Sequence, residues 1–274
     1  MGVLNVTPDS FFDGGRYFDP GKAVARGLEL AGQGADIIDI GGESTRPGSD
    51  PIPAEEEVRR TVPVISALRK QTSAFLSIDT TKFEVARAAV DAGADIINDI
   101  SALRFEEEIL SLAAKRGVAV VLMHMQGVPK TMQVAPSYAD PLAEVKGFLV
   151  KRLGAALQAG LGRDRILLDP GIGFGKRLKD NLVLLNHLSV LDDLGCPILV
   201  GPSRKGFIGK LLDLPPEDRL EGTIAASVIS VARGAHILRV HDVQSVRRAV
   251  RVAEAILGEE ETTGGLEEPG RYVC

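Results

Sequence analysis

The fold can be predicted from the stretch Gly34-Ala35-Asp36-Ile37-Ile38-Asp39-Ile40, which recurs as Gly93-Ala94-Asp95-Ile96-Ile97-Asn98-Asp99. A weaker echo follows at Gly234-Ala235-His236-Ile237-Leu238. In each copy a glycine, the residue that most often follows the end of a helix, stands directly before a short run rich in β-branched residues. This order predicts the end of a helix, a short turn and a buried strand, which is one connection of a repeating βα fold.

Eight short apolar runs of this kind occur along the chain, and nearly every one stops at a polar residue. They are residues 3–4, 37–40, 75–78, 96–97, 118–123, 166–168, 198–200 and 237–240. Helical patterns are expected between them, near residues 19–34, from 54 onward, and at 82–92, 106–116, 141–159, 181–194, 221–233 and 243–257. Runs this short between helices are typical of buried parallel strands.

Eight βα units in 274 residues predict a single α/β domain, a (β/α)8 TIM barrel over residues 1–258, with its active site at the carboxyl ends of the strands. An open, doubly wound sheet is the alternative, and it also places ligands at those strand ends. The tail, residues 259–274, has too little apolar content to pack and is expected to be disordered.

Composition and charge argue against several classes of function. A formal net charge of −5 and a pI near 5.5, without a basic stripe, do not favour nucleic-acid binding. No apolar stretch reaches the roughly 18 residues of a membrane span, so no membrane partner is expected. Two cysteines, Cys196 and Cys274, form neither a disulfide framework nor a metal motif, which favours a reducing, cytoplasmic setting.

Two loops that follow strands are long and polar. Residues 5–15, Asn-Val-Thr-Pro-Asp-Ser-Phe-Phe-Asp-Gly-Gly, are longer than a simple connection needs, which favours a functional lid over an ordinary turn. In residues 41–48, Gly-Gly-Glu-Ser-Thr-Arg-Pro-Gly, the hydroxyls and the guanidinium of Arg46 lie among glycines, a pattern that suits an anion. The alternative for this second loop is a flexible surface segment with a solvated arginine.

Carboxylate or amide groups end three of the strands: Asp79, Asn98 and Asp169. Around a barrel these three side chains would point into one central cavity, where they can hydrogen-bond the donor-rich edge of a polar heterocycle. For Asp79 alone, an N-cap of the following helix is the alternative.

The glycine-rich stretch 169–176, Asp-Pro-Gly-Ile-Gly-Phe-Gly-Lys, does not match a nucleotide motif. Pro170 occupies the first glycine position of a P-loop, and Arg177 stands where Ser or Thr is required. The glycines are expected to let this loop pass close under a flat ligand, with Phe174 as an apolar wall.

Cationic groups follow the last two strands, in Ser203-Arg204-Lys205 and Arg239-Val240-His241. Barrels often bind phosphate there; the alternative is solvated charges and a histidine satisfied by the core. The four histidines lack zinc spacing, which argues against catalytic zinc. A Mg²⁺ ion held jointly by oxygen ligands of the protein and a phosphate is left open. No role is assigned to His124, which also ends a strand.

Together these segments resemble the dihydropteroate synthase family of folate biosynthesis. The motifs that carry the resemblance occur in the family's order at residues 2–11, 42–48, 77–80, 97–99, 169–175, 203–205 and 239–241. The resemblance implies a (β/α)8 barrel, usually a homodimer, that joins 4-aminobenzoate to 6-hydroxymethyl-7,8-dihydropterin diphosphate and releases diphosphate.

The resemblance also implies roles for individual residues. The pterin is expected to contact Asp79, Asn98, Asp169 and Lys205. The diphosphate is expected to contact Thr45, Arg239 and His241, with Mg²⁺ on Asn5. The aminobenzoate pocket, where sulfonamides compete, is expected to be formed by Phe11, Arg46, Pro47, Phe174 and the stem of Lys205. Catalytic roles are expected for Asp79, Lys205, Asp13 and Arg46.

Two departures from the family pattern concern the start of the chain. The family usually has residues before strand one that help to close the bottom of the barrel, whereas here Met1 almost opens that strand. Either the start is truncated or the bottom of the barrel is closed in another way. Phe12 stands where the family commonly has a small polar residue. This puts the contacts of the first lid in question.

Two other functions compete with the synthase. A pterin-binding methyltransferase domain, which uses methyltetrahydrofolate and a corrinoid partner, shares the barrel but should lack the lid motif at residues 7–11 and the Ser-Arg-Lys segment. A non-catalytic pterin or phosphate carrier is the third possibility. The retained Asn5, Arg46, Lys205 and Arg239 argue against it.

Overall fold

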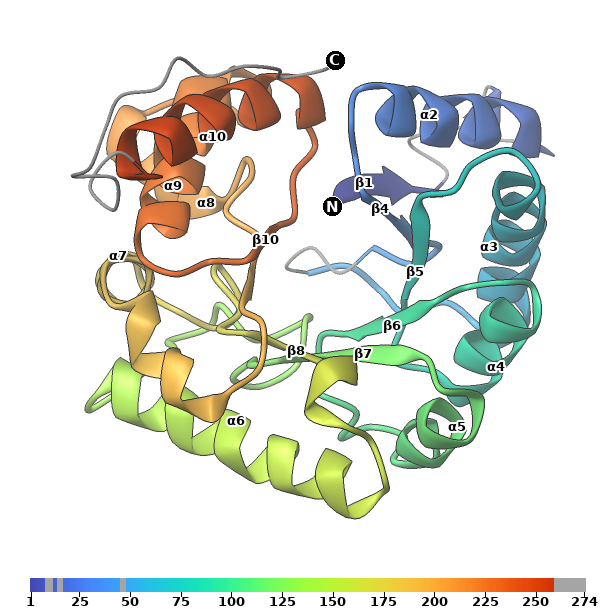
Figure 1. The fold of residues 1–274 in the computed structure, drawn as a ribbon, viewed down its shortest axis with the longest axis horizontal. Helices are drawn as coiled ribbons and strands as arrows, with labels where there is room; N and C mark the ends of the chain where they lie inside the picture. The colour runs from blue at the N-terminus through green and yellow to red at the C-terminus, as the bar shows by residue number, and fades with distance from the viewer. Residues whose placement is uncertain (8–11, 14–16, 45–47, 259–274) are drawn as a thin grey trace.

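The structure, a computed structural model, describes residues 1–7, 12–13, 17–44 and 48–258, with the backbone alone at 12, 13, 17 and 18 (Figure 1). Eight parallel strands line its centre. They are β1 (Gly2–Asn5), β4 (Ile37–Gly41), β5 (Phe75–Asp79), β6 (Ile96–Asp99), β7 (Ala119–Met123), β8 (Ile166–Asp169), β9 (Leu199–Val200) and β10 (Ile237–Leu238). Each predicted strand is therefore present at its expected place.

The strands close into a ring. Six of them form one sheet in the order β1-β4-β5-β6-β7-β8, and β9 pairs with β10. Parallel bridges join these two groups, from Leu168 to Ile198 on one side and from Gly2 to Val240 on the other. The closed ring confirms the (β/α)8 barrel and removes the open sheet as an alternative.

Helices surround the ring of strands (Figure 1). They are α2 (Pro20–Gly32), α3 (Ala54–Arg69), α4 (Phe83–Asp91), α5 (Glu108–Arg116), α6 (Pro141–Gln158), α7 (Leu178–Asn186), α8 (Gly206–Leu212), α9 (Leu220–Ala232) and α10 (Val243–Gly258). Two of the helix starts are capped by an aspartate. The carboxylate of Asp19 accepts from the backbone N–H groups of α2, and Asp140 does the same for α6.

The turns at the bottom of the barrel also follow the repeat. Gly34, Gly93 and Gly234 all have left-handed backbone conformations, with φ of +93°, +109° and +98°. This region is open to glycine at little cost. The repeated glycine therefore marks the same αβ turn three times.

Several short elements were not predicted. The expected helix at 181–194 is divided at His187, which leaves the helical region, into α7 and the 3₁₀ helix η2 (Leu188–Leu194). The short α8 follows β9, two 3₁₀ turns occupy η1 (Arg163–Arg165) and η3 (Pro216–Asp218), and β2 (Phe12–Asp13) pairs antiparallel with β3 (Tyr17–Phe18). Among the described helices, none is long and apolar enough to cross a membrane.

Candidate active site

The alternation of side chains along the strands separates an apolar bottom of the barrel from a polar top. A cluster of buried side chains from different strands comprises Met1, Ile37, Ile96, Val121, Leu167 and Leu199. Side chains two residues apart on a strand share a face. Two residues beyond four of these positions stand Asp39, Asn98, Asp169 and Gly201. The period of the strand thus places these four residues above apolar residues of the barrel bottom.

One cavity brings together six of the predicted site residues. It lies at the carboxyl ends of the strands, and its walls include Asp79, Asn98, Asp169, Phe174, Lys205 and Arg239. Apolar or small residues complete the lining: Ile100, Met123, Gly171, Ile172 and Gly201. The expected heterocycle residues and one aromatic wall therefore converge on a single space.

Arg239 is held between two carboxylates. Its Nε lies 2.6 Å from Oδ2 of Asp39, and its Nη2 lies 2.7 Å from Oδ2 of Asp79. Asn98 donates to the same Asp39 oxygen over 3.0 Å. Burial lowers the pKa of Arg239, but the two carboxylates outweigh burial and raise it above its usual value. Arg239 is therefore a fixed cation in the cavity wall.

The sequence analysis did not predict Asp39 as a site residue. Its side chain is fully buried in the structure. It stands inside an apolar run and not at its end, so the search for polar strand ends passed over it. The signal was available: a carboxylate in the middle of a buried strand requires a partner. Arg239 and Asn98 supply that partner here.

Two of the cavity carboxyls have raised pKa values. Burial raises the pKa of Asp79 to about 7, with Arg239 opposing the shift and Asp39 adding to it. Burial also raises the pKa of Asp169 to about 6, against the backbone N–H of Gly171, which donates to its Oδ1 over 2.6 Å. Burial disfavours the charged form of a carboxyl group. Carboxyl groups in a cavity whose pKa values are shifted in this way are common in functional sites.

Lys205 covers Phe174. Its Nζ lies 4.1 Å from the centre of the Phe174 ring, a cation–π contact. Burial, together with Arg239, lowers the pKa of Lys205 to about 8. The cavity thus has a cation and a flat apolar ring side by side.

His241 is bonded to Ser203 and does not line this cavity. The hydroxyl of Ser203 accepts from the backbone N–H of His241 and lies 3.0 Å from its Nδ1. Burial, with help from the neighbouring arginines, lowers the pKa of His241 to about 4, so the ring is neutral near pH 7. Where the Ser203 hydroxyl donates in this contact, the hydrogen of the neutral ring is on Nε2. Arg204 pairs instead with Asp242.

Several expected residues cannot be placed. Phe11, Thr45, Arg46 and Pro47 lie outside the described residues, and at Asp13 only the backbone is described. Asn5 ends β1 opposite Gly41 of β4 and is partly buried. Among the described residues, no group of three His, Cys, Asp or Glu side chains could hold a metal ion.

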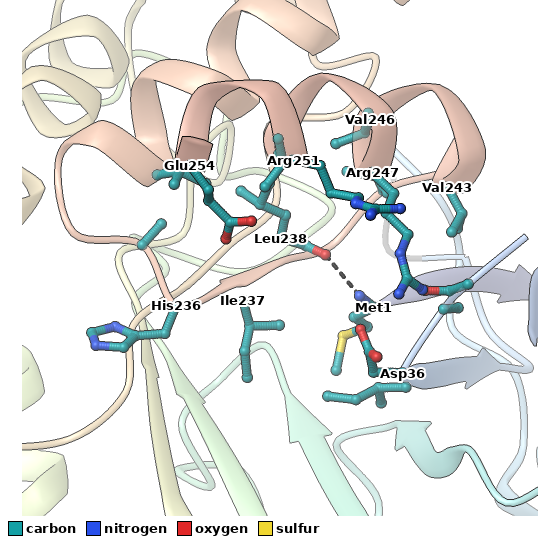
Figure 2. Close-up of a pocket in the computed structure, with 17 residues that line it drawn as sticks. Met1, Asp36, His236, Ile237, Leu238, Val243, Val246, Arg247, Arg251 and Glu254 are labelled. Carbon is teal, nitrogen blue, oxygen red and sulfur yellow. Dashed lines mark hydrogen bonds between the residues drawn. The ribbon is translucent and has the colours of Figure 1, made fainter. Parts of the chain in front are cut away.

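A second cavity lies at the other end of the molecule (Figure 2). It is bounded by residues at the starts of β4 and β10 and by α10, and the amino group of Met1 donates to the carbonyl of Leu238 beside it. Barrel enzymes carry their chemistry at the carboxyl ends of the strands. This hollow is therefore not the candidate active site.

Comparisons with known proteins agree with this geometry. Residues 1–241 match the family described as "Pterin binding enzyme". The dihydropteroate synthase of Escherichia coli (strain K12) is 48% identical over 261 residues, which cover 95% of this chain and 92% of that protein.

Solved structures are similarly close. A Yersinia pestis dihydropteroate synthase in complex with a sulfonamide drug has a TM-score of 0.89 and 45% identity, with 94% of this chain and 93% of that one covered. Xanthomonas albilineans dihydropteroate synthase with 4-aminobenzoic acid has a TM-score of 0.87 and 52% identity, covering 93% and 92%. The same enzyme in complex with 7,8-dihydropteroate has a TM-score of 0.84 and 49% identity, over the same shares of the two chains. The chain therefore belongs to the dihydropteroate synthase family of pterin-binding enzymes.

Proposed function

We propose that the cavity at the top of the barrel joins 6-hydroxymethyl-7,8-dihydropterin diphosphate to 4-aminobenzoate. As a member of its family, the chain is a transferase of folate biosynthesis that makes dihydropteroate. One observation carries the assignment to this cavity: Asp79, Asn98 and Asp169 meet in it beside Lys205 and Arg239. The methyltransferase alternative loses its support, since relatives named dihydropteroate synthase match nearly the whole chain.

The pterin is proposed to lie among the three polar strand ends. Carboxylates accept the ring N–H groups, while the amide of Asn98 can both donate and accept. Phe174 forms an apolar wall beside these groups, and the ammonium of Lys205 lies over its ring. The donor-rich heterocycle therefore matches the walls in polarity.

The diphosphate is proposed to lie at the rim near the last two strands. Arg239 is a permanent cation there, and the neutral ring of His241 is proposed to present its Nε2–H as a donor. Thr45 is the third proposed contact. Negative charge grows on the leaving diphosphate as the C–O bond breaks, and donors aimed at that charge lower the barrier.

The reaction is proposed to begin with C–O cleavage. The bonding electron pair leaves with the diphosphate, and the methylene carbon of the dihydropterin becomes cationic. Ionised Asp79 and Asp169 stabilise that cation electrostatically in a site with little water. The amine of 4-aminobenzoate then attacks the methylene carbon, and its proton passes to the released diphosphate. Asp13, in the first lid, is proposed to help to order the metal and the amine. Arg46, in the second lid, is proposed to order the carboxylate of 4-aminobenzoate.

Asn5 is proposed to contribute to a Mg²⁺ site. Its amide oxygen is a hard ligand of the type Mg²⁺ prefers, and Mg²⁺ commonly takes few protein ligands beside substrate phosphates and water. One side-chain oxygen at the mouth of β1 fits this pattern. When bound, the ion would offset charge on the diphosphate.

The 4-aminobenzoate pocket is proposed to combine Phe174 and the stem of Lys205 with Phe11, Arg46 and Pro47 of the lids. The contact between Phe174 and Lys205 supports the part of this pocket that these two residues would form. Sulfonamides, which share the aminobenzene group, are proposed to compete for the same place.

A homodimer and a cytoplasmic location are also proposed. The neighbouring helices α9 and α10 expose large apolar side chains, with Ile229 at 50%, Val252 at 61% and Ile256 at 66% exposure. Such surfaces on soluble proteins often mark interfaces. Cys196 is a buried free thiol, which suits a reducing compartment.

Diphosphate release tests the proposed reaction. The protein is mixed with dihydropterin diphosphate, 4-aminobenzoate and Mg²⁺, and both diphosphate and dihydropteroate are measured. Release that depends on 4-aminobenzoate, with matching dihydropteroate, is the expected result. No release under any condition would point to the non-catalytic carrier instead.

A further inference from the structure

Lys176 is a buried cation with an unusual set of partners. Its side chain is 3% exposed, and no carboxylate among the described residues forms an ion pair with it. Its Nζ instead lies 2.8 Å from the carbonyl of Gly171, 3.1 Å from that of Phe174 and 2.9 Å from Nδ1 of His124. A buried ammonium is costly unless its hydrogens are accepted. These acceptors therefore hold it in place.

The contacts of Lys176 reach residues that form the heterocycle cavity. Gly171 and Phe174 both line that cavity. Gly171 has φ of +69°, and a Cβ there would lie 1.9 Å from the carbonyl oxygen of His124. The backbone N–H of His124 in turn donates to the carbonyl of Asp169. The loop after β8 thus packs closely against His124, and Lys176 contacts both the loop and the His124 side chain.

His124 is suited to accept from Lys176. Burial, aided by the charge of Lys176, lowers the pKa of His124 to about 2, so its ring is neutral. The ammonium has no lone pair, so Nδ1 must accept and the ring hydrogen is on Nε2. The ring also packs edge-on against Phe148, with 4.9 Å between ring centres. His124 is therefore a rigid acceptor.

The charge of Lys176 acts on Asp169. Burial raises the pKa of Asp169, and the hydrogen bond from Gly171 and the charges of Lys205, Lys176 and Arg239 oppose this rise. Burial lowers the pKa of Lys176 itself to about 7, with Asp169 and Asp180 opposing the shift and Lys205 adding to it. At the pH where Asp169 titrates, Lys176 is still largely charged.

We propose that Lys176, held by His124, is a positioning residue of the heterocycle site, which fixes the Gly171–Phe174 loop and favours the ionised form of Asp169. The inference rests on the proposed function, because it assumes that ionised Asp169 binds the pterin. It assigns roles to two buried groups that the reaction itself does not use.

The test measures the dissociation constant of 7,8-dihydropteroate by calorimetry, from about pH 5 to about pH 9, for Lys176→Met. Lys179→Met, an exposed lysine in the next helix, is the matched control. Without the buried cation the pKa of Asp169 rises further above about 6. For a rise of about one unit, binding should weaken about twofold at pH 7 and roughly tenfold near pH 5, and the midpoint of its loss in acid should lie about one unit higher. Lys179→Met should behave as the wild type.

Two variants of His124 test the same contact if Lys176→Met does not fold. In His124→Asn the amide oxygen replaces Nδ1 as acceptor, so its binding profile should stay near the wild type. His124→Leu removes the acceptor and should shift the acidic loss of binding upward. Thermal unfolding of each variant separates lost stability from a changed profile.

Distinct results overturn the two proposals. The inference on Lys176 fails if Lys176→Met, or His124→Leu, has the same pH midpoint as Lys179→Met and only a lower melting temperature. Wild-type protein that neither binds 7,8-dihydropteroate nor forms it overturns the proposed function instead.

Discussion

The guanidinium of Arg239 and the carboxylate of Asp39 lie 2.6 Å apart, although 200 residues separate them along the chain. Asp39→Asn leaves Arg239 with Asp79 alone and weakens the contact to Asn98. We expect about a tenfold lower kcat/KM for dihydropterin diphosphate and a loss of about 1–3 kcal/mol of stability, since a buried charge loses a partner. Steady-state kinetics and urea unfolding measure both.

Asp36→Asn is the control for this change, because Asp36 is exposed just before the same strand. It should leave kinetics and stability near the wild type. Equal behaviour of the two variants would mean that the Asp39 contact does not matter to the site.

Asp169→Asn should stabilise the protein while it removes activity. Burial raises the pKa of Asp169 to about 6. The folded state therefore holds a proton between about pH 4 and pH 6 that the unfolded state has released, and this stability is lost as pH rises through 6. Asparagine does not ionise, and its oxygen can still accept from Gly171. The variant should therefore gain on the order of 1 kcal/mol over the wild type at about pH 7.5.

Urea unfolding at about pH 4.5 and about pH 7.5 checks this prediction. The difference in unfolding free energy between variant and wild type should grow with pH, while dihydropteroate formation falls at both. A variant that becomes relatively less stable as pH rises would contradict the raised pKa.

The lowered pKa of Lys205 predicts that activity falls at alkaline pH. Burial lowers its pKa to about 8, so its charge is lost as the pH rises above 8. We expect kcat/KM to fall there. Lys205→Arg, which stays charged, should be less active near pH 7 but should lose the decline. The control is Lys210→Arg, at an exposed lysine of α8, and a decline that persists in Lys205→Arg would assign it to another group.

The exposed apolar face of α9 and α10 predicts the dimer. Ile229→Lys and Ile256→Lys each place a charge on it, and together they should convert a dimer to monomers in sedimentation experiments. Val150→Lys, on α6 and 47% exposed, is the control that should leave the mass unchanged. A wild type that sediments as a monomer would refute the homodimer.

The fold was predictable because its signals are local and repeated. A strand of four or five residues shows as an apolar run, and its closing polar residue marks the mouth of the barrel. Asp79, Asn98 and Asp169 were found in this way, and all three line the cavity. Phe174 and Lys205 were found by their motifs, and they too are in contact.

The missed features depend on contacts between distant parts of the chain. Asp39 is interpretable only with Arg239, and Lys176 only with the carbonyls of a folded loop and with His124 from another loop. In the sequence, Lys176 was considered only as the last residue of the stretch 169–176, which does not match a P-loop. The short α8 has too few residues for a clear helical period. The sequence therefore reveals strand ends more readily than the partners that hold them.

Asp79→Asn separates binding from bond breaking. An asparagine keeps an oxygen acceptor for the pterin, but it removes the negative charge proposed to stabilise the cationic methylene group. Arg239 then loses the Asp79 half of its two-carboxylate contact, although Asp39 continues to hold it. We expect diphosphate release in a single turnover to slow by about a hundredfold, a difference of about 2.7 kcal/mol in the barrier. The dissociation constant of dihydropterin diphosphate should change only a few-fold.

Rapid-quench measurement of diphosphate gives the rate of bond breaking, and calorimetry gives the dissociation constant. Equal losses in both would mean that Asp79 binds the ground state as strongly as the transition state, which contradicts the dissociative route.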